Sequence, residues 1–456
     1  MSFLASSSLC QAEGRKPNVL VIVADDLGYG DPAIQGGKDI PTPNIDAIAR
    51  NGIRFTSGYV SAPICSPSRA GLMTGRYQQR FGHEFNPGPL GTLAGEGGLP
   101  VGEKTMGDCF KAANYTTGWF GKSHLGMLPE FHPQKRGFDE FYGFLDGAHN
   151  YLKVADKDGV NAVMRGTQPV EKIGYTTESF AEETVSFIAR HKDQPWLVYL
   201  PFNAVHGPLQ ATPKYLARFP QLTDNKRRTF AAQLSALDDA VGSVVGKIRE
   251  LHLEEDTLIF FISDNGGAPG ESTSSNAPLR GAKGSLWEGG IRVPMMVQWK
   301  SHLPAGKVDD RPVISLDILP TALAAAGEKP DPQHPMDGVN LLPYLTGEKP
   351  GDPHELLYWR FGNLGVVRKG SWKMIRVLPE GIGPKTIGEK AALEGGALYD
   401  LDKDISEKTN LSAREPEKLK ELNAAWETWN AQLMPAQWPP LGQGGEEPAG
   451  TPAAEH

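Results

Sequence analysis

The chain carries a cysteine beside the predicted start of a short helix, within the stretch Ser61–Tyr77 (SAPICSPSRAGLMTGRY). Ser66 and Pro67 are residue types that favour the N-cap and first turn of a helix. Cys65 is therefore expected just ahead of a helix N-terminus, where free backbone N–H groups and the helix dipole favour an anion. Arg69, about one turn further on, can add a charged donor for an oxyanion. The stretch predicts a nucleophile beside an anion site, although a lone cysteine is ordinarily a small buried hydrophobe.

Oxygen ligands follow the ends of two predicted strands that are apolar throughout. Asp25 and Asp26 come directly after the first strand, and Asp264 and Asn265 come after the second. Two adjacent carboxylates repel one another unless a cation holds them. Oxygen ligands without His or Cys suit Ca²⁺ or Mg²⁺ rather than zinc. We expect a Ca²⁺ site with Mg²⁺ as the alternative, and a simple turn or capping pair remains open for Asp25-Asp26.

Basic side chains lie at comparable places. Lys122 and His124 follow the predicted strand Tyr115–Phe120, and His206 follows another strand. Lys283 stands in a glycine-rich segment. Taken singly, such a lysine is usually a solvated surface charge and such a histidine a structural group. His149 and Asn150 are candidate substrate contacts, with an ordinary loop as the equal alternative.

Strands that alternate with helices must position these groups. The predicted strands are Asn18–Ala24, Tyr115–Phe120, Trp196–Leu200, Thr257–Ser263 and Pro294–Trp299, and the longest predicted helix is Arg228–Leu251. This alternation predicts an α/β fold with a mostly parallel sheet. Ligands collect at the carboxyl ends of such strands, so the polar groups are expected to converge on one rim.

Four regions are expected along the chain. Residues 1–16 form a leader or disordered N-terminus, and residues 17–350 form the catalytic domain. Residues 351–434 form a smaller α+β domain with short antiparallel strands, ended by the amphipathic helix Pro416–Leu433. Residues 435–456, rich in Pro, Gly and Glu, form a disordered tail.

Composition excludes several classes of protein. The chain has 456 residues, 39% of them hydrophobic and 22% charged, and a net charge of −8, which argues against nucleic-acid binding. The three cysteines, Cys10, Cys65 and Cys109, form no disulfide framework. No stretch approaches the ~18 apolar residues of a membrane span. The start MSFLASSSLC is similar to the end of an export or lipoprotein signal, with a gene-start artefact as the alternative. The sequence leaves the oligomeric state open.

Cys65-Ser66-Pro67-Ser68-Arg69 is also the C-x-P-S-R signature of the type I, formylglycine-dependent sulfatases of the alkaline-phosphatase superfamily. The resemblance extends over nearly the whole ordered length. Further matching segments are Asp25–Asp31, Gly121–His124, His206–Pro208, Ser263–Gly266 and Gly281–Arg292. The chain looks most like the branch that acts on aryl sulfates and N-acetylgalactosamine 6-sulfate. Ser123 departs from the Trp commonly found at its position.

The resemblance implies an alkaline-phosphatase-like α/β/α sandwich and a role for each residue of the site. Cys65 resembles the nucleophile, converted to formylglycine (3-oxoalanine) by a maturation enzyme, and it completes the metal shell of Asp25, Asp26, Asp264 and Asn265. Arg69 and Lys122 would steady the nucleophile and the sulfate charge. His124 would take a proton as sulfate is released. His206 would protonate the leaving alcohol, and Lys283 would contact the bridging oxygen or the sulfate.

The expected function is hydrolysis of a sulfate ester of a carbohydrate, such as an N-acetylgalactosamine or galactose sulfate, or of an aryl sulfate. Two alternatives stay open. One is a phosphonate or phosphate monoester hydrolase on the same scaffold, since fold does not settle function. The other is a non-catalytic protein that binds sulfated glycans. The expected location is periplasmic or secreted, with lipid anchoring through Cys10 as a variant.

Overall fold

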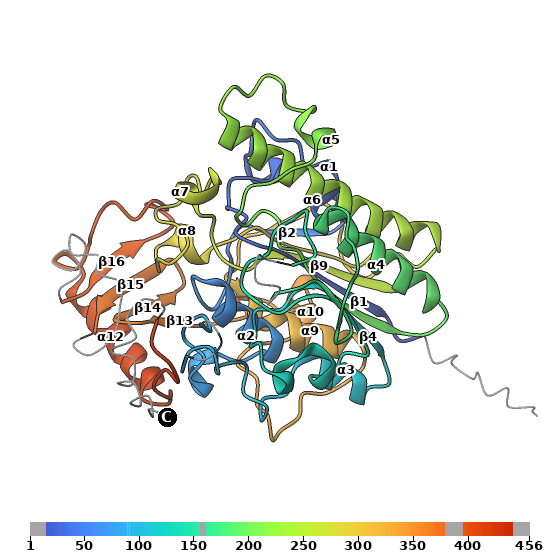
Figure 1. Cartoon of the computed structure of the whole chain (residues 1–456). Coiled ribbons are helices and arrows are strands. Elements are labelled where there is room, and N and C mark those ends of the chain that lie inside the picture. Colours follow the sequence, from blue (N-terminus) through green and yellow to red (C-terminus); the bar gives the residue numbers. More distant parts are fainter. Residues whose placement is uncertain (1–14, 89, 91, 156–160, 379–394, 441–456) are drawn as a thin grey trace, which may run out of the picture.

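The computed structural model describes residues 15–88, 90, 92–155, 161–378 and 395–440. A ten-stranded, mostly parallel sheet lies between two layers of helices, and a four-stranded antiparallel sheet with helix α12 packs beside it (Figure 1). The expected α/β/α sandwich and the antiparallel C-terminal sheet are both confirmed.

The large sheet has the strand order β11-β2-β10-β9-β1-β8-β4-β5-β6-β7. Its strands are β1 (Asn18–Ala24), β2 (Ile53–Phe55), β4 (Thr116–Lys122), β5 (Glu140–Phe144), β6 (Met164–Arg165), β7 (Gln168–Pro169), β8 (Trp196–Pro201), β9 (Thr257–Ser263), β10 (Met295–Gln298) and β11 (Lys307–Asp309). A separate pair joins β3 (Gly58–Tyr59) to β12 (Val313–Ile314). Strands β9, β1, β8 and β4 are consecutive neighbours and all parallel, so their carboxyl ends lie along one edge.

The central strands are apolar along their whole length because helices cover both faces of the sheet. In β1 the side chains of Val19 and Val21 enter one core, and those of Leu20 and Ile22 enter the other. Strands β1 and β9 have the predicted bounds. Strand β4 ends at Lys122, two residues later than predicted, which puts that lysine on the strand itself.

The helices divide between the two faces of the sheet (Figure 1). The layer on one face is made by α1 (Pro43–Arg50), α4 (Thr176–Arg190) and α6 (Asn225–Glu250), and the layer on the other by α2 (Cys65–Thr74), α3 (Met106–Ala112) and α9 (Ile318–Ala325). Short helices are α5 (Pro213–Leu216), α7 (Pro269–Ser272), α8 (Glu288–Ile291) and α10 (Leu342–Leu345). Single 3₁₀ turns lie at 33–35, 78–81, 129–131, 133–135 and 315–317. In the part of the chain that the structure describes, no helix is long and apolar enough to cross a membrane.

The C-terminal subdomain consists of β13 (Leu357–Phe361), β14 (Leu364–Lys369), β15 (Trp372–Val377), β16 (Ala397–Asp400) and α12 (Pro416–Asn430). Helix α12 packs its buried Trp426 and Trp429 on this sheet. Residues 435–440, which the sequence analysis assigned to a disordered tail, lie against the larger domain. Trp438 is only 3% exposed there, because its ring fills a space beside Gly97. The remainder of that predicted tail, the predicted leader and Cys10 lie outside the described residues.

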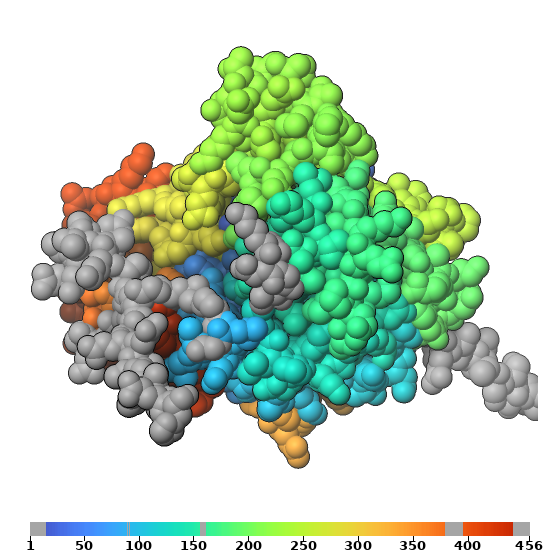
Figure 2. Space-filling model, in the orientation of Figure 1, coloured from blue at the N-terminus to red at the C-terminus, as the bar shows by residue number. Residues whose placement is uncertain are grey.

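The space-filling view shows how the two parts meet on one face (Figure 2). The orange and red C-terminal subdomain adjoins the yellow segment around α7, and blue N-terminal residues reach the surface between that segment and the teal segments that precede α4. Segments far apart in the sequence therefore meet on this face.

Candidate active site

Cys65 is the first residue of α2 rather than the residue before the helix, and Ile64 takes the N-cap position. The expectation that Ser66 caps the helix is therefore wrong. Its backbone N–H instead donates to Asn86 Oδ1 at 3.0 Å, so a loop residue satisfies one of the free donors of the first turn. Every residue of α2 is buried, which holds Cys65 on a rigid element.

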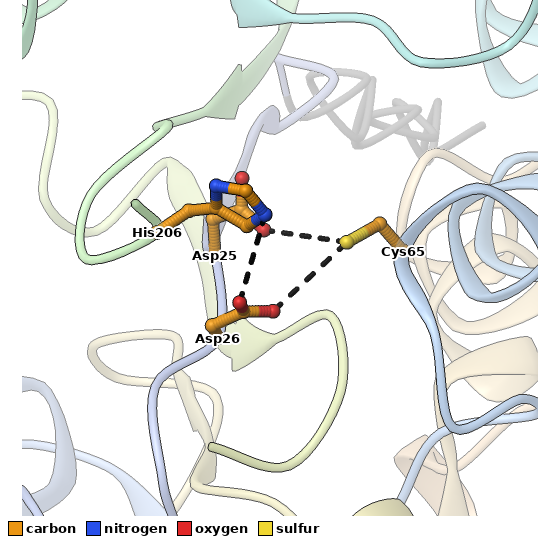
Figure 3. Close-up of side chains that lie close together, drawn as sticks. All are labelled: Asp25, Asp26, Cys65 and His206. Atoms are coloured by element: carbon orange, nitrogen blue, oxygen red, sulfur yellow. Dashed lines mark hydrogen bonds and ion pairs between the residues drawn. The ribbon is translucent and has the colours of Figure 1, made fainter. Parts of the chain in front are cut away.

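The acidic pair faces Cys65 across the rim of the sheet (Figure 3). Asp25 and Asp26 follow the end of β1, and their Oδ1 atoms lie 3.6 and 3.9 Å from Cys65 Sγ. His206, in the loop after β8, completes a group whose ligand atoms all lie within 4.8 Å of one another. His206, for which the family resemblance implied a proton-transfer role, was not expected among the metal ligands.

Asp264 and Asn265 join the same site from the end of β9. Asp264 Oδ1 accepts from the backbone N–H of Asp26 at 3.2 Å, and Asn265 Nδ2 donates to Asp26 Oδ1 at 2.7 Å. Asn265 Oδ1 is fully buried and has no hydrogen-bond partner among the described residues. Such an oxygen needs a partner, and a hard cation held by the neighbouring carboxylates would supply one. The donor atoms present therefore fit a Ca²⁺ or Mg²⁺ ion.

Three cations balance the carboxylates of this site. Lys122 Nζ lies 2.7 Å from Asp25 Oδ2, and Lys283 Nζ lies 2.8 Å from Asp26 Oδ2. Arg69 binds Asp264 Oδ2 through Nε at 2.9 Å and through Nη2 at 2.7 Å. The side chains of Lys122 and Arg69 are fully buried, and burial of unpaired charges at this depth would be prohibitive.

Burial and these charges set the protonation of the groups between them. Burial raises the pKa of the Cys65 thiol well above its usual value, and Lys122 and Lys283 offset this only in part, so an unmodified Cys65 is a neutral thiol. Burial alone would lower the pKa of Lys283, but the surrounding acidic groups, the Asp26 and Asp25 carboxylates among them, raise it well above the usual value. Lys283 is therefore a permanent cation beside the acidic pair.

The two histidines differ in their surroundings. Burial, reinforced by Lys122 and Arg69, lowers the pKa of His124 well below its usual value, so the ring is neutral near pH 7. Its ring packs on Gly147, where a Cβ would come within 2.6 Å of ring atoms. His206 is more open, and its Nδ1–H donates to the carbonyl of Gly207 at 2.6 Å. This leaves Nε2, 3.7 Å from Asp26 Oδ2, facing the site.

His149 and Asn150 make different contacts. The His149 ring is 2% exposed, packs on Phe144 and lies 3.2 Å from the carbonyl of Val154. Asn150 Oδ1 accepts from the backbone N–H of Leu152 at 2.9 Å. These contacts are local and structural, and the predicted substrate role of both residues stays a prediction.

Several residues that support the site carry no sequence signal of their own. His83 Nε2 lies 2.7 Å from Ser66 Oγ, and Trp438 Nε1 donates to the carbonyls of Phe85 and Asn86 at 3.2 and 3.1 Å. Tyr151 Oη donates to the carbonyls of Asn203 and His206, at 2.6 and 2.8 Å. Each contact joins segments distant in sequence, so only the folded chain reveals it.

The chain is similar in sequence and structure to several known proteins. Residues 17–328 match the family model described as Sulfatase. N-acetylgalactosamine-6-sulfatase of Sus scrofa is 32% identical over 378 residues, covering 78% of this chain and 71% of the relative. Arylsulfatase A of Homo sapiens is 32% identical over 478 residues, covering 96% of this chain and 91% of the relative. A solved structure, Ps i-CgsB in complex with k-i-k-neocarrahexaose, shares 35% identity and a TM-score of 0.84, covering 93% of this chain and 95% of that one.

Proposed function

Because this chain belongs to the sulfatase family, and so is a sulfuric ester hydrolase, we propose that it removes sulfate from a sulfated carbohydrate with Cys65 as the site of the nucleophile. The observation that carries the proposal is the meeting of Cys65 with the acidic pair and with Lys122 and Lys283 on the rim of the sheet. The substrate class is a galactose or N-acetylgalactosamine sulfate. The names of the relatives and of the carbohydrate bound to Ps i-CgsB support this class.

The proposed modification of Cys65 answers a problem of reactivity. A buried neutral thiol is a poor nucleophile, since the thiolate is the reactive form. As a formylglycine hydrate, residue 65 would supply two hydroxyl groups, one to attack sulfur and one to release sulfate. Its position in the first turn of α2, a helix buried throughout, would hold residue 65 on a rigid element at the positive end of the helix dipole.

A divalent cation would be held by Asp25, Asp26, Asp264 and Asn265, together with an oxygen on residue 65. Such an ion would supply Lewis-acid polarisation of a sulfate oxygen. The orphaned Oδ1 of Asn265 and the oxygen-rich donor set support calcium, with magnesium as the alternative.

The remaining side chains bind charge and move protons. Lys122, Lys283 and Arg69 gather positive charge where the sulfate group would sit. The neutral ring of His124 can accept a proton from residue 65. A protonated Nε2 of His206 can donate to the leaving alcohol, because the Gly207 carbonyl fixes the opposite ring nitrogen as a donor.

Two measurements on one purified sample test this proposal. Protein co-expressed with a formylglycine-generating maturation enzyme is digested, and the mass of the peptide that contains Cys65 is measured by mass spectrometry. We expect the mass of a peptide that has lost sulfur and gained an aldehyde. The same sample is assayed on an aryl sulfate, an aryl phosphonate and a panel of sulfated galactose and N-acetylgalactosamine oligosaccharides. Cys65→Ala serves as the matched control.

We expect turnover of the sulfates to exceed turnover of the phosphonate, and we expect it to need the modified residue. Faster phosphonate turnover would instead support the monoester-hydrolase alternative. Sulfated-glycan binding without turnover by modified protein would support the binding-protein alternative. The maturation enzyme as partner and a periplasmic or secreted location stay predictions.

A further inference from the structure

The segment 280–291, which we name the Lys283 loop, contacts the active site along one side. Lys283 Nζ lies 2.8 Å from Asp26 Oδ2. Its backbone N–H donates to the carbonyl of Gly267 at 3.1 Å, and the next N–H donates to the carbonyl of Pro63 at 2.9 Å. The loop is therefore joined directly to the segments that carry Asp264 and Cys65.

The opposite side of the Lys283 loop rests on the C-terminal subdomain. Lys373, on β15, lies between two carboxylates, with its Nζ 2.9 Å from Glu288 Oε1 and 2.8 Å from Glu407 Oε1. Glu288 belongs to α8, which ends the loop, and Glu407 follows β16. All three side chains are fully shielded from solvent.

Glu407 also holds the loop at two points by hydrogen bonds. Its Oε2 accepts from the backbone N–H of Glu288 at 2.7 Å, and its own carbonyl accepts from Arg280 Nη1 at 2.8 Å. The Arg280 guanidinium stacks on Trp287, 3.6 Å from the ring centroid. One residue of the C-terminal subdomain thus fixes the first and the ninth residue of the loop.

Charged and polar side chains surround the Glu288 carboxylate and keep it ionised. Burial raises the pKa of Glu288, but Lys373, Arg292 and Arg368 outweigh burial and hold that pKa below its usual value. Tyr59 Oη donates to Glu288 Oε2 at 2.5 Å, and Arg292 Nη1 lies 3.2 Å from the same atom. Burial raises the pKa of Glu407 to about 7 even with Lys373 present. Without Lys373, the two glutamates would face each other in a space closed to water, so either one takes up a proton or α8 moves to separate them, and both changes alter the contact that holds the loop.

We propose that Lys373 and Glu407 are positioning residues for Lys283: through Glu288 and Arg280 they fix the loop that carries this lysine to the acidic pair. The inference rests on the proposed function, because it concerns the geometry of the same site. The C-terminal subdomain, which supplies none of the groups at the reaction centre, would thus position one of them.

The test compares Lys373→Met with Lys369→Met, a matched control on the same hairpin. Lys369 makes exposed ion pairs with Glu355 and Glu421, both at 3.0 Å, so its removal should leave kcat/KM unchanged. Lys373→Met should lower kcat/KM on an aryl sulfate about 10- to 100-fold, the scale expected when a catalytic group is misplaced by about 1 Å. Amide hydrogen exchange should rise in the Lys283 loop and stay unchanged in β1 and β9.

A double variant separates positioning from a general loss of structure. If Lys373 acts through Lys283, then in a Lys283→Met background Lys373→Met should change kcat/KM by less than about twofold. Equal effects of Lys373→Met with and without Lys283 would overturn the proposal. So would a folded Lys373→Met protein with unchanged kcat/KM or unchanged exchange in the loop.

A milder variant keeps the proposal testable if Lys373→Met does not fold. Glu407→Gln keeps an oxygen that can accept from the Glu288 N–H, and it replaces the oxygen that faces Lys373 with an uncharged amide NH2 group, which cannot accept from the ammonium. Glu407→Gln should lower kcat/KM less than Lys373→Met does, with the same rise of amide hydrogen exchange in the Lys283 loop. Unchanged exchange in that loop would count against the proposal. Failure of modified wild-type protein to turn over any sulfate ester would refute the proposed function instead, and the exchange measurement would still judge the positioning of the loop.

Discussion

Replacing Asn265 by alanine should abolish most of the stabilisation that calcium gives this protein. Asn265 Oδ1 is buried without a hydrogen-bond partner among the described residues, and it lies on the residue whose Nδ2 donates to Asp26 Oδ1 at 2.7 Å. If a cation occupies this site, that oxygen is one of its ligands. Its removal therefore weakens cation binding as well as one hydrogen bond.

The magnitude follows from linkage. At calcium about 100 times Kd, binding to the folded state stabilises it by about 2.7 kcal/mol, and a 100-fold weaker site leaves about 0.4 kcal/mol at the same concentration. Unfolding entropy is about 2.1 cal/mol/K per residue, so for 456 residues 1 kcal/mol corresponds to about 1 °C in Tm. Calcium should thus raise the wild-type Tm by about 3 °C and the Asn265→Ala Tm by less than about 1 °C.

The assay is scanning calorimetry of chelator-treated protein with and without calcium, alongside isothermal titration to obtain Kd. A parallel magnesium titration separates the two ions. Asn18→Ala is the control, because Asn18 is equally buried at the other end of β1 and donates to Thr257 Oγ1 at 3.3 Å. Both variants should lower the metal-free Tm, but only Asn265→Ala should reduce the calcium increment.

Two results would refute the reasoning. An Asn265→Ala protein whose calcium increment and Kd equal those of wild type would remove Asn265 from the ligand set. A wild-type protein that neither calcium nor magnesium stabilises would remove the proposed metal site altogether.

Two further predictions concern stability away from the reacting groups. Burial alone would lower the pKa of His354, but the Asp317 carboxylate, 2.8 Å away, raises it above the usual value. The pair therefore stabilises the fold fully below the unfolded pKa of about 6.5, and this contribution is lost as pH rises through the raised pKa of the folded state. The Tm difference between wild type and His354→Gln should therefore shrink between about pH 5.5 and pH 9, and a constant or growing difference would contradict the assignment. Trp438→Phe removes the donor to the carbonyls of Phe85 and Asn86 and should cost about 1–3 kcal/mol in urea unfolding. Trp429→Phe is its control, because Trp429 Nε1 is buried without a partner in the described part of the chain, and equal costs for the two variants would argue against the Trp438 hydrogen bonds.

Local signals in the sequence were sufficient for the elements that the core encloses. The run Asn18–Ala24 is apolar throughout because helices cover both faces of β1, and this pattern predicted the strand with its observed bounds. The same logic placed polar residues after β9 and β8. Because these parallel strands are neighbours, their carboxyl ends meet, and the predicted convergence of Asp25, Asp264 and His206 follows.

Short or irregular elements were beyond local reasoning. Strand β5 (Glu140–Phe144) is not among the predicted strands, because its five residues carry no clear alternation and pair with β4 only in the folded sheet. Ser66 resembles an N-cap, yet the N-cap is Ile64 and the helix begins at Cys65, two residues earlier than a Ser66 cap would imply, while Asn86 Oδ1 accepts from the Ser66 N–H. Tertiary contacts outweigh local preference at such ends.

The sequence alone determined the family, the nature of the strands and which residue types could do chemistry, because spacing and polarity along the chain encode these features directly. Tertiary structure alone decided how charge is balanced, since Lys122 pairs with Asp25 across 97 positions and Lys373 reaches Glu288 across 85. The energy of such a pair depends on the distance between its charges and on the exclusion of water, and both quantities exist only once distant segments have packed together.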